Sequence, residues 1–423
     1  MPTESIETVI VGGGQAGLAM SYHLGQLGRE HIVIERRRIA ERWRSERWDS
    51  LCFQAPNWNL RLPGFPYQAT DPDAFAPRDE VVRYIEGYSG AIRAPVRCGV
   101  EATTLRRKIG STRLVLDTTA GRFEAENIVI ATGPFQVPSP IPMAWRGTLQ
   151  LHSSQYRNPE QLPPGDVLVV GSGNSGCQIA EELCATHRRL YLSVSSHQRT
   201  PRRYRGKDFI WWNLALGDAD RTIGQRVSAQ PSRLMTGVGG GHDVDLRRLA
   251  ADGVVLLGRV CGGDDGKIAF APDLRANLAR GDASLVALTR RCDEHAARSG
   301  LDLPLPDAPE PLPDPDEVAA PIPSLDLAAA GISTIIWATG FHYDFGWVDL
   351  PVFGAGSGAT HRAPNHTRGV TSVPGVYFLG LPWLHKWKSA FLFGVGEDAE
   401  YLATRIAAAS KVGGSAMARR RHA

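Results

Sequence analysis

The sequence lacks the features that mark several common classes of protein. Its six cysteines never form a CxxC or CxxxxC pair, which argues against flavoproteins that reduce disulfides through a closely spaced dithiol. No apolar run approaches the roughly 20 residues of a membrane helix. A β-branched run begins by about Ile6, so no signal peptide is expected before it. We therefore expect a cytoplasmic protein that does not bind a membrane.

A dominant charge and a metal-binding pattern are missing as well. The 47 basic and 44 acidic residues give a formal charge of +3, which is too balanced to indicate a nucleic-acid partner. The twelve histidines show no ligand-like spacing with cysteines or carboxylates, so no metal site is predicted. The 423 residues, 43% of them hydrophobic, are enough for two domains with sizeable cores.

The sequence does contain one strand–turn–helix pattern twice, as ETVIVGGGQAGLAMSYHL at residues 7–24 and DVLVVGSGNSGCQIAEEL at residues 166–183. Each copy has the GxGxxG spacing that places a pyrophosphate at a helix N-terminus. Two purely structural turns are the alternative. The glycines are Gly12, Gly14 and Gly17 in the first copy, and Gly171, Gly173 and Gly176 in the second.

The two copies differ where the second strand of each unit ends. In the first, EHIVIERRR ends its apolar run at Glu35, whose carboxylate suits the ribose diol of FAD or NAD. In the second, LYLSVSSHQRTPRR carries Ser196 and Arg199 and no carboxylate, which favours a 2′-phosphate and hence NADP. A solvated basic loop is the alternative for this arginine. The two units therefore predict one FAD site and one NADPH site.

The fold class predicted is α/β, with two Rossmann-like dinucleotide-binding domains. The FAD domain is expected to be discontinuous, formed by residues 1–160 and 330–410, with the NADPH domain inserted as residues 161–329. Eight prolines lie between Leu303 and Ser324. Such a stretch forms neither a regular helix nor a central strand, so it is an extended connector or a disordered linker. We expect it to return the chain to the FAD domain, which STIIWATGF would help complete. Residues 411–423 are expected to form a disordered basic tail.

These motifs together resemble the class B flavin-dependent monooxygenases, including the bacterial flavin-containing monooxygenase-like group and the YUCCA-type enzymes. An ATG turn follows both units, at residues 131–133 and 338–340. The inter-domain segment WRGTLQLHSSQYR has Trp145, Gly147, His152 and Tyr156 at positions close to the family signature. It departs from that signature in its tryptophan, where phenylalanine is usual, and in one extra residue between the glycine and the histidine.

The resemblance implies FAD held without a covalent link, NADPH as reductant and O2 as co-substrate. The reaction implied is oxygenation of a small organic substrate through a flavin C4a-(hydro)peroxide. Two other functions stay open: an NADPH-dependent flavin oxidase or reductase that releases H2O2, and a non-enzymatic nucleotide-sensing accessory flavoprotein. Neither the substrate nor a homo-oligomeric state is specified by the sequence.

Candidate site residues follow from the fingerprints and from the family's usual arrangement around the flavin. Gln54, Asn57 and Lys388 are the candidate catalytic residues, with a surface loop as the alternative for the asparagine. The candidate cofactor-binding residues are Gly12, Gly14, Gln15, Ala16, Gly17, Glu35, Arg36, Trp43, Arg44, Gly133, Gly171, Gly173, Asn174, Ser175, Gly176, Ser196, Arg199 and Gly340.

Overall fold

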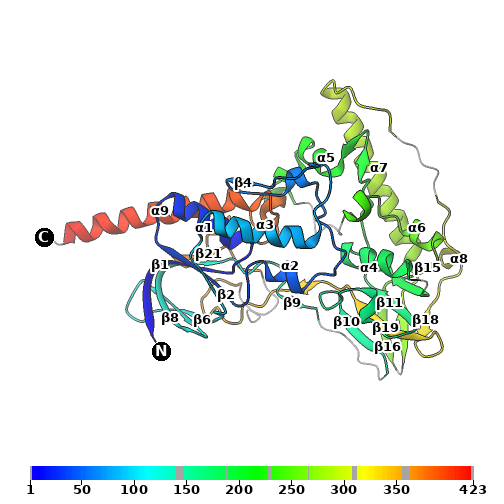
Figure 1. Cartoon of the computed structure of the whole chain (residues 1–423), viewed down its shortest axis with the longest axis horizontal. Helices are drawn as coiled ribbons and strands as arrows, with labels where there is room; N and C mark the ends of the chain where they lie inside the picture. The colour runs from blue at the N-terminus through cyan, green and yellow to red at the C-terminus, as the bar shows by residue number, and fades with distance from the viewer. Residues whose placement is uncertain are drawn as a thin grey trace.

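A computed structural model describes residues 2–139, 147–186, 188–226, 231, 233–264, 266–306, 312–354 and 363–420, with side chains through residue 409. Two lobes lie side by side, each built on its own sheet (Figure 1). The chain passes from the first lobe to the second and back, and ends in a long helix on the first lobe.

The first lobe contains a sheet in the order β5-β2-β1-β8-β7-β6, with β21 pairing to β8. Its central strands β1 and β8 are parallel and apolar, and their Val9, Ile10, Ile128 and Val129 are fully buried. The strands are β1 (Thr3–Val11), β2 (His31–Glu35), β5 (Val96–Cys98), β6 (Ala102–Arg107), β7 (Leu114–Thr118), β8 (Gly121–Ile130) and β21 (Val376–Phe378). The helices of this lobe are α1 (Gln15–Gln26), α2 (Glu41–Ser45), α3 (Arg78–Ala91) and α9 (Val395–Arg420).

The second lobe contains a parallel sheet in the order β10-β19-β11-β12-β15 and a three-stranded antiparallel sheet. The parallel strands are β10 (Leu149–His152), β11 (Asp166–Val170), β12 (Leu190–Ser193), β15 (Val254–Leu257) and β19 (Ile332–Trp337). The antiparallel strands are β16 (Val260–Asp264), β17 (Lys267–Phe270) and β18 (Ser324–Asp326). The helices are α4 (Asn174–Cys184), α5 (Phe209–Ala215), α6 (Leu246–Ala251), α7 (Leu274–Arg298) and α8 (Asp316–Ala319).

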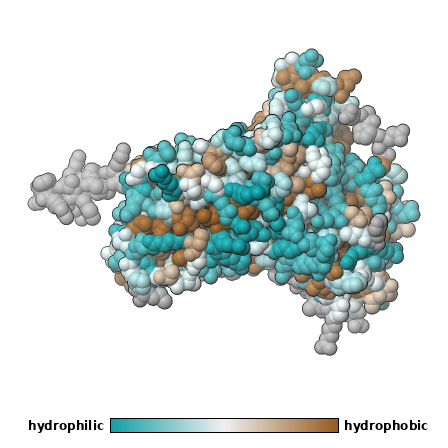
Figure 2. Space-filling view, in the orientation of Figure 1, coloured by the Kyte–Doolittle hydropathy of each residue, from teal (hydrophilic) through white to brown (hydrophobic). Residues whose placement is uncertain are grey.

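Short elements complete the described chain. Three two-stranded ribbons are β3 (Arg61–Leu62) with β4 (Phe65–Pro66), β9 (Val137–Pro138) with β20 (Phe341–His342), and β13 (Arg203–Tyr204) with β14 (Lys207–Asp208). The 3₁₀ turns are η1 (Asn57–Asn59), η2 (Pro159–Gln161), η3 (Asp218–Asp220), η4 (Ile223–Gln225), η5 (Val238–Gly240) and η6 (Trp387–Ala390). The outer surface in Figure 2 is largely hydrophilic, with apolar residues gathered in a band across the first lobe.

The predicted α/β fold class is confirmed, and so is the discontinuous first lobe, because β21 returns to the first sheet after the whole second sheet has formed. The assignment of STIIWATGF to the first lobe is wrong. Strand β19 pairs in parallel with both β10 and β11, so the proline-rich connector returns the chain to the second sheet. The apolar side chains of this strand are buried on both faces of the second sheet, as expected of a central parallel strand.

Two smaller expectations also differ from the structure. Within the proline-rich stretch the single turn α8 begins directly after Pro315, whose extended backbone lies outside the helix. Residues 307–311 lie outside the described part of the chain. Helix α9 continues through residues 411–420 instead of ending before them, although Gly413 and Gly414 in this stretch have low helix propensity. Residues 421–423 of the predicted tail lie outside the described residues. No described helix is both long and apolar enough to span a bilayer.

Candidate dinucleotide site

The first glycine turn joins β1 to α1 by close backbone packing. Gly12 has φ +117°, and a Cβ there would lie 2.5 Å from the carbonyl oxygen of Ala131 in the first ATG turn. A Cβ at Gly17 would lie 1.9 Å from the carbonyl oxygen of Gly12. Helix α1 begins behind Gly14, which makes no side-chain cap, and its first turn has no acidic residue. The N–H groups of this turn are therefore available to an anion.

Glu35 ends β2 beside this turn. One of its carboxylate oxygens accepts a hydrogen bond from the Gly13 backbone N–H at 2.8 Å, and the other accepts from Arg37 N–H at 2.9 Å. Each oxygen keeps a second lone pair for a ribose hydroxyl. The arrangement fits the adenosine ribose of a dinucleotide.

The second turn, between β11 and α4, has nearly the same geometry. Gly171 has φ +106°, and a Cβ there would lie 2.6 Å from the carbonyl oxygen of Ala338 in the second ATG turn. A Cβ at Gly176 would lie 1.8 Å from the Gly171 carbonyl oxygen. Gly173 begins α4 without a side-chain cap. The repetition of ATG therefore has a packing reason: each alanine carbonyl lies directly against the first glycine of a turn.

Both turns open into a cavity of about 830 Å³. Helix α1 reaches it through Gly14 and Gln15, and α4 reaches it through Gly173 and Ser175. The predicted site residues that line this cavity are Gly12, Gly14, Gln15, Ala16, Glu35, Arg36, Trp43, Gln54, Gly133, Gly173, Asn174, Ser175 and Gly340. The structure thus brings most of the predicted residues of the two units together around one space.

Aromatic and apolar side chains form the rest of the wall. Phe135 and Phe341 meet edge to face at 5.3 Å between ring centroids, and Phe391 stacks on Phe393 at 5.7 Å. The segment that carries the second pair is tied to α1, because the Gln15 side-chain amide donates to the Ala390 carbonyl oxygen at 2.6 Å. Apolar walls of this kind exclude water from a buried reaction.

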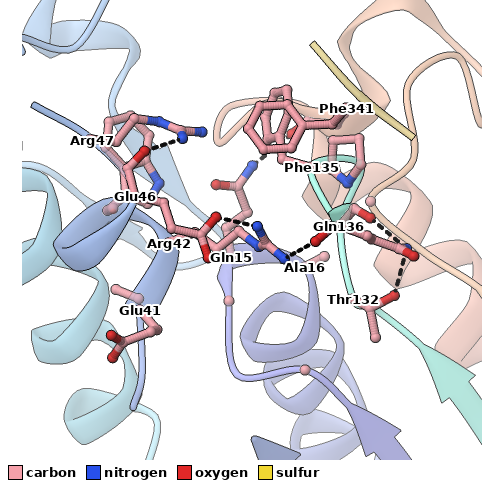
Figure 3. Close-up of a pocket in the computed structure, with 18 of the residues that line it drawn as sticks. Gln15, Ala16, Glu41, Arg42, Glu46, Arg47, Thr132, Phe135, Gln136 and Phe341 are labelled. Carbon is pink, nitrogen blue, oxygen red and sulfur yellow. Dashed lines mark hydrogen bonds and ion pairs between the residues drawn. The ribbon is translucent and has the colours of Figure 1, made fainter. Parts of the chain in front are cut away.

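Several charged residues that were not predicted also line the cavity, among them Arg42, Glu46 and Arg47. Arg42 donates to the Gln136 carbonyl oxygen at 2.9 Å and pairs with Glu46 (Figure 3), and burial lowers the pKa of this guanidinium. Arg47 lies over the Phe135 ring, 5.2 Å from its centroid, and burial lowers its pKa to about 10. The charged segment RWRSER at residues 42–47 was the sequence feature that could have indicated these residues. Its local pattern does not indicate which of its side chains point into the cavity.

Several predicted residues lie away from the cavity. Arg44 pairs with Glu86 on α3. Asn57 is 7% exposed, and its side-chain amide donates to the Asp71 carbonyl oxygen at 3.0 Å. Gly17, Gly171 and Gly176 pack inside the turns, and Ser196 and Arg199 lie beyond the end of β12.

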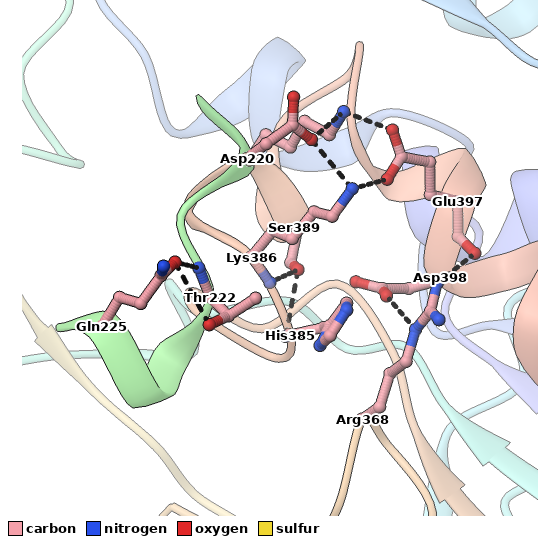
Figure 4. Close-up of polar contacts among 10 residues, drawn as sticks. Asp220, Thr222, Gln225, Arg368, His385, Lys386, Ser389, Glu397 and Asp398 are labelled. Carbon is pink, nitrogen blue, oxygen red and sulfur yellow. Dashed lines mark hydrogen bonds and ion pairs between the residues drawn. The ribbon is translucent and has the colours of Figure 1, made fainter. Parts of the chain in front are cut away.

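Lys388 also lies outside the cavity lining. Its ammonium group is 2.9 Å from an Asp220 carboxylate oxygen and pairs with Glu397 in the first turn of α9. Lys386 makes the same two ion pairs, each at 2.8 Å (Figure 4). Because Asp220 belongs to η3 in the second lobe, this cluster joins the two lobes. The paired lysines lower the pKa of Asp220.

The inter-domain segment is held in a similar way. His152 lies with one ring nitrogen 2.9 Å from the Gly340 carbonyl oxygen and the other 2.9 Å from the Ser154 hydroxyl. Burial lowers the pKa of this histidine. Tyr156 is fully buried and donates to Glu182 at 2.7 Å. Both residues fix the path of the chain between the lobes, and Trp145 of the same signature lies outside the described residues.

Comparison with known proteins places these features in context. The sequence profile named for pyridine nucleotide-disulphide oxidoreductases matches residues 9–210. A protein of Geobacillus kaustophilus (strain HTA426) named "Uncharacterized oxidoreductase CzcO-like" is 33% identical over 411 residues, covering 95% of this chain and 98% of the relative. The rice protein (Oryza sativa subsp. japonica) named indole-3-pyruvate monooxygenase YUCCA4 is 31% identical over 205 residues, covering 44% of this chain and 46% of the relative.

Among solved structures, a flavin-containing monooxygenase from Stenotrophomonas maltophilia aligns with a TM-score of 0.63 at 18% identity. The alignment covers 96% of this chain and 99% of that one. A similarity at this level of identity concerns the fold alone.

Proposed function

Because the chain belongs to the family of CzcO-like oxidoreductases, flavin-dependent relatives of the class B monooxygenases, we propose that it is an FAD- and NADPH-dependent monooxygenase. In this function it uses O2 to oxygenate a small organic substrate. The observation that carries the proposal is the single cavity into which both glycine turns open. Two dinucleotides bound at these turns would lie in one space, as hydride transfer between them requires.

The donor set around the first turn supports FAD. The uncapped N-terminus of α1 offers N–H groups to the pyrophosphate, and Glu35 offers its carboxylate to the ribose. A Cβ on Gly14 would meet no protein atom within 4 Å, so a ligand has room to approach the backbone there. When bound, FAD supplies the two-electron redox chemistry and the reaction with O2.

The chain's own residues then have three tasks. The first turns of α1 and α4 hold the pyrophosphates, and the aromatic walls at Phe135 and Phe391 exclude water. The start of α9, at Val395, directs the positive end of a helix dipole toward the segment that lines the cavity. Gln54 is the predicted catalytic side chain that reaches this space, and we propose that it donates a hydrogen bond to the reacting group.

For Lys388 the ion pairs support a positioning role. Asp220 and Glu397 hold its ammonium group away from the cavity, so it fixes the loop that carries Trp387 and Phe391. Asn57 likewise supports the loop that carries Gln54 through its hydrogen bond to the Asp71 carbonyl oxygen.

The test compares the amount of NADPH consumed with the amounts of H2O2 and oxygenated product formed. The purified holoprotein is supplied with NADPH, ¹⁸O2 and a panel of small N-, S- and carbonyl-containing compounds, and both H2O2 and labelled product are quantified. A monooxygenase incorporates one ¹⁸O atom per NADPH with at least one compound. Stoichiometric H2O2 with every compound would instead support the oxidase function, and negligible NADPH turnover would support a nucleotide-sensing protein.

A variant pair links this test to the cavity. Gln54→Ala should increase the fraction of NADPH that ends as H2O2, because it removes a polar group from the cavity wall. The matched control is Gln68→Ala, an exposed amide whose described hydrogen bond is to the Pro66 carbonyl oxygen. Equal H2O2 fractions in the two variants would contradict the role of Gln54.

A further inference from the structure

An arginine of α7 lies at the end of β12, beside the serine that the sequence analysis assigned to the second nucleotide. Arg280 donates from its guanidinium to the Ser196 hydroxyl at 3.1 Å. Helix α7 is anchored at this point, because the buried Asn277 donates to the Val194 carbonyl oxygen at 3.1 Å. The guanidinium is therefore held near the strand end by a fixed helix.

Arg199, the other candidate, is already neutralised. Its two terminal nitrogens lie 2.6 Å from Asp245 and 2.6 Å from Asp282. Arg247 shares this network, 2.9 Å from Asp282 and 2.8 Å from Asp314. To bind a phosphate, Arg199 would have to leave two carboxylates, and the phosphate would approach their negative charge.

Arg280 differs in both respects. It is exposed, and among the described residues no carboxylate lies within ion-pair distance of it. Its other described side-chain partner is the Asn277 amide oxygen at 3.4 Å, a neutral group. A guanidinium in this state keeps most of its donors for an incoming anion.

The position of this guanidinium indicates which anion it would meet. In a dinucleotide-binding unit the end of the second strand faces the 2′ position of the adenosine ribose, where an acid binds the diol and an arginine accommodates a 2′-phosphate. The first unit has Glu35 there. The second has the apolar Val194 at the matching position, because Gly12 N–H bonds to the Ile34 carbonyl oxygen as Gly171 N–H bonds to that of Ser193. Ser195 and Ser196 follow Val194. We propose that Arg280 and Ser196 form the 2′-phosphate subsite of the second nucleotide, and that Arg199 is a structural residue of the Asp245–Asp282 network. This inference rests on the proposed use of NADPH.

The experiment measures nucleotide binding rather than turnover. Isothermal titration of the flavin-loaded protein with NADP⁺ and NAD⁺ gives both dissociation constants for the wild type, Arg280→Ala and Arg199→Ala. Loss of charge-assisted hydrogen bonds to a phosphate should weaken NADP⁺ binding by about tenfold or more in Arg280→Ala, with NAD⁺ binding unchanged. In Arg199→Ala the two constants should change by the same factor, because this residue would not contact the phosphate.

Two further variants sharpen the result. Arg280→Lys keeps the charge but not the forked geometry, so its NADP⁺ affinity should fall between that of the wild type and that of Arg280→Ala. Arg199→Lys replaces Arg199→Ala if the alanine variant does not fold. Selective loss of NADP⁺ binding in an Arg199 variant, or unchanged NADP⁺ binding in Arg280→Ala, would overturn the assignment. Binding of neither nucleotide by the wild type would instead refute the proposed function itself.

Discussion

The two glycine turns are close copies in three dimensions. The first glycine of each has a positive φ, +117° at Gly12 and +106° at Gly171, and each lies against the carbonyl oxygen of an alanine. The third glycine of each turn packs equally closely on the first. A Cβ at Gly17 would lie 1.9 Å from the Gly12 carbonyl oxygen, and a Cβ at Gly176 would lie 1.8 Å from the Gly171 carbonyl oxygen. The backbone of the turn is therefore set by packing against an ATG strand end and is nearly the same in the two units.

The difference lies in how each turn is tied to the end of its second strand. In the first unit the Glu35 carboxylate accepts from the Gly13 N–H at 2.8 Å. In the second unit the corresponding connection is made by the Ser172 hydroxyl, which accepts from the Ser195 N–H at 2.9 Å. One unit thus has a carboxylate at the strand end, whereas in the other the connecting Ser172 hydroxyl is fully buried and carries no charge. The nucleotide preference proposed for each unit therefore rests on the strand end and not on the glycine turn.

The largest effect is expected where the shared packing is broken. Gly17→Ala and Gly176→Ala each place a Cβ less than 2 Å from a backbone oxygen, and each should lower the free energy of unfolding by about 3 kcal/mol. Gly14→Ala is the control, since its Cβ would meet no atom within 4 Å. Urea unfolding of the three variants compares them, and a loss in Gly17→Ala no greater than in the control would contradict the packing argument.

Next in size are changes at the second glycine of each turn, where a pyrophosphate would approach the backbone. Gly14→Val should prevent the close approach of a pyrophosphate to α1, and the ratio of FAD to protein should fall by about tenfold or more. Gly173→Val should leave FAD bound and weaken nicotinamide nucleotide binding instead. Flavin absorbance gives the FAD content of each variant, and titration gives the affinity of each variant for the nicotinamide nucleotide. Full flavin occupancy in Gly14→Val would refute the assignment of the first turn to FAD.

Sequence patterns were sufficient for the features that are local. Both turns, with the strand before and the helix after each, follow from glycine spacing and apolar runs within a few residues. The sequence pattern did not predict the sheet to which β19 belongs. Its pairing with β10 and β11 depends on packing between segments that are distant in the sequence. The α/β class and the inserted second unit were predictable because two complete fingerprints are rarely accidental.

The candidate site was predictable in part for the same reason. Most of the predicted turn residues line the cavity, and Glu35 and Arg36 join them, whereas the predicted cations Arg44, Arg199 and Lys388 do not. Lys388 is paired with Asp220, 168 positions away in the sequence (388 − 220), and Arg199 with Asp282, 83 positions away. Ion pairs of this range depend on the tertiary fold, so a sequence pattern could not reveal that these cations are neutralised.

A smaller effect on FAD affinity is expected from a change at the end of β2, the strand end that carries a carboxylate. Glu35→Gln retains an oxygen for the Gly13 N–H but removes the charge that strengthens hydrogen bonds from ribose hydroxyls. FAD should bind about tenfold more weakly, and nicotinamide nucleotide binding should not change. The matched control is Glu101→Gln, a second cavity carboxylate, whose described ion-pair partner is Arg36 at 4.0 Å. Equal FAD loss in both variants would mean that overall charge, rather than the Glu35 position, determines retention.

The smallest expected effect concerns the residues that follow the two strand ends. After β2 these are three exposed arginines at positions 36–38, whereas the stretch after β12 includes His197, which is 1% exposed. One ring nitrogen lies 3.1 Å from the Ser195 carbonyl oxygen, and the other has no hydrogen-bond partner among the described residues. Burial lowers the pKa of His197, which outweighs the opposing hydrogen bond to the Ser195 carbonyl oxygen, and the charge of Arg199 lowers it further. The carboxylates of Asp282 and Asp245 have smaller effects that raise it.

The sign of the pH dependence follows from that shift. The folded pKa lies below the ordinary value of 6.5, so as the pH falls through 6.5 the unfolded chain takes up the proton first and folding stability declines. One such group contributes up to about 1.4 kcal/mol per pH unit until the lowered folded pKa is reached. In His197→Asn this part of the decline should disappear from urea unfolding measured between pH 7.5 and 5.5. His242 provides the opposite control, because Glu181 raises its pKa and its replacement should make the acid-side decline steeper. A pH profile unchanged by His197→Asn would show that the second strand end accommodates the protonated ring, and the contrast with the exposed arginines of the first unit would then have no energetic consequence.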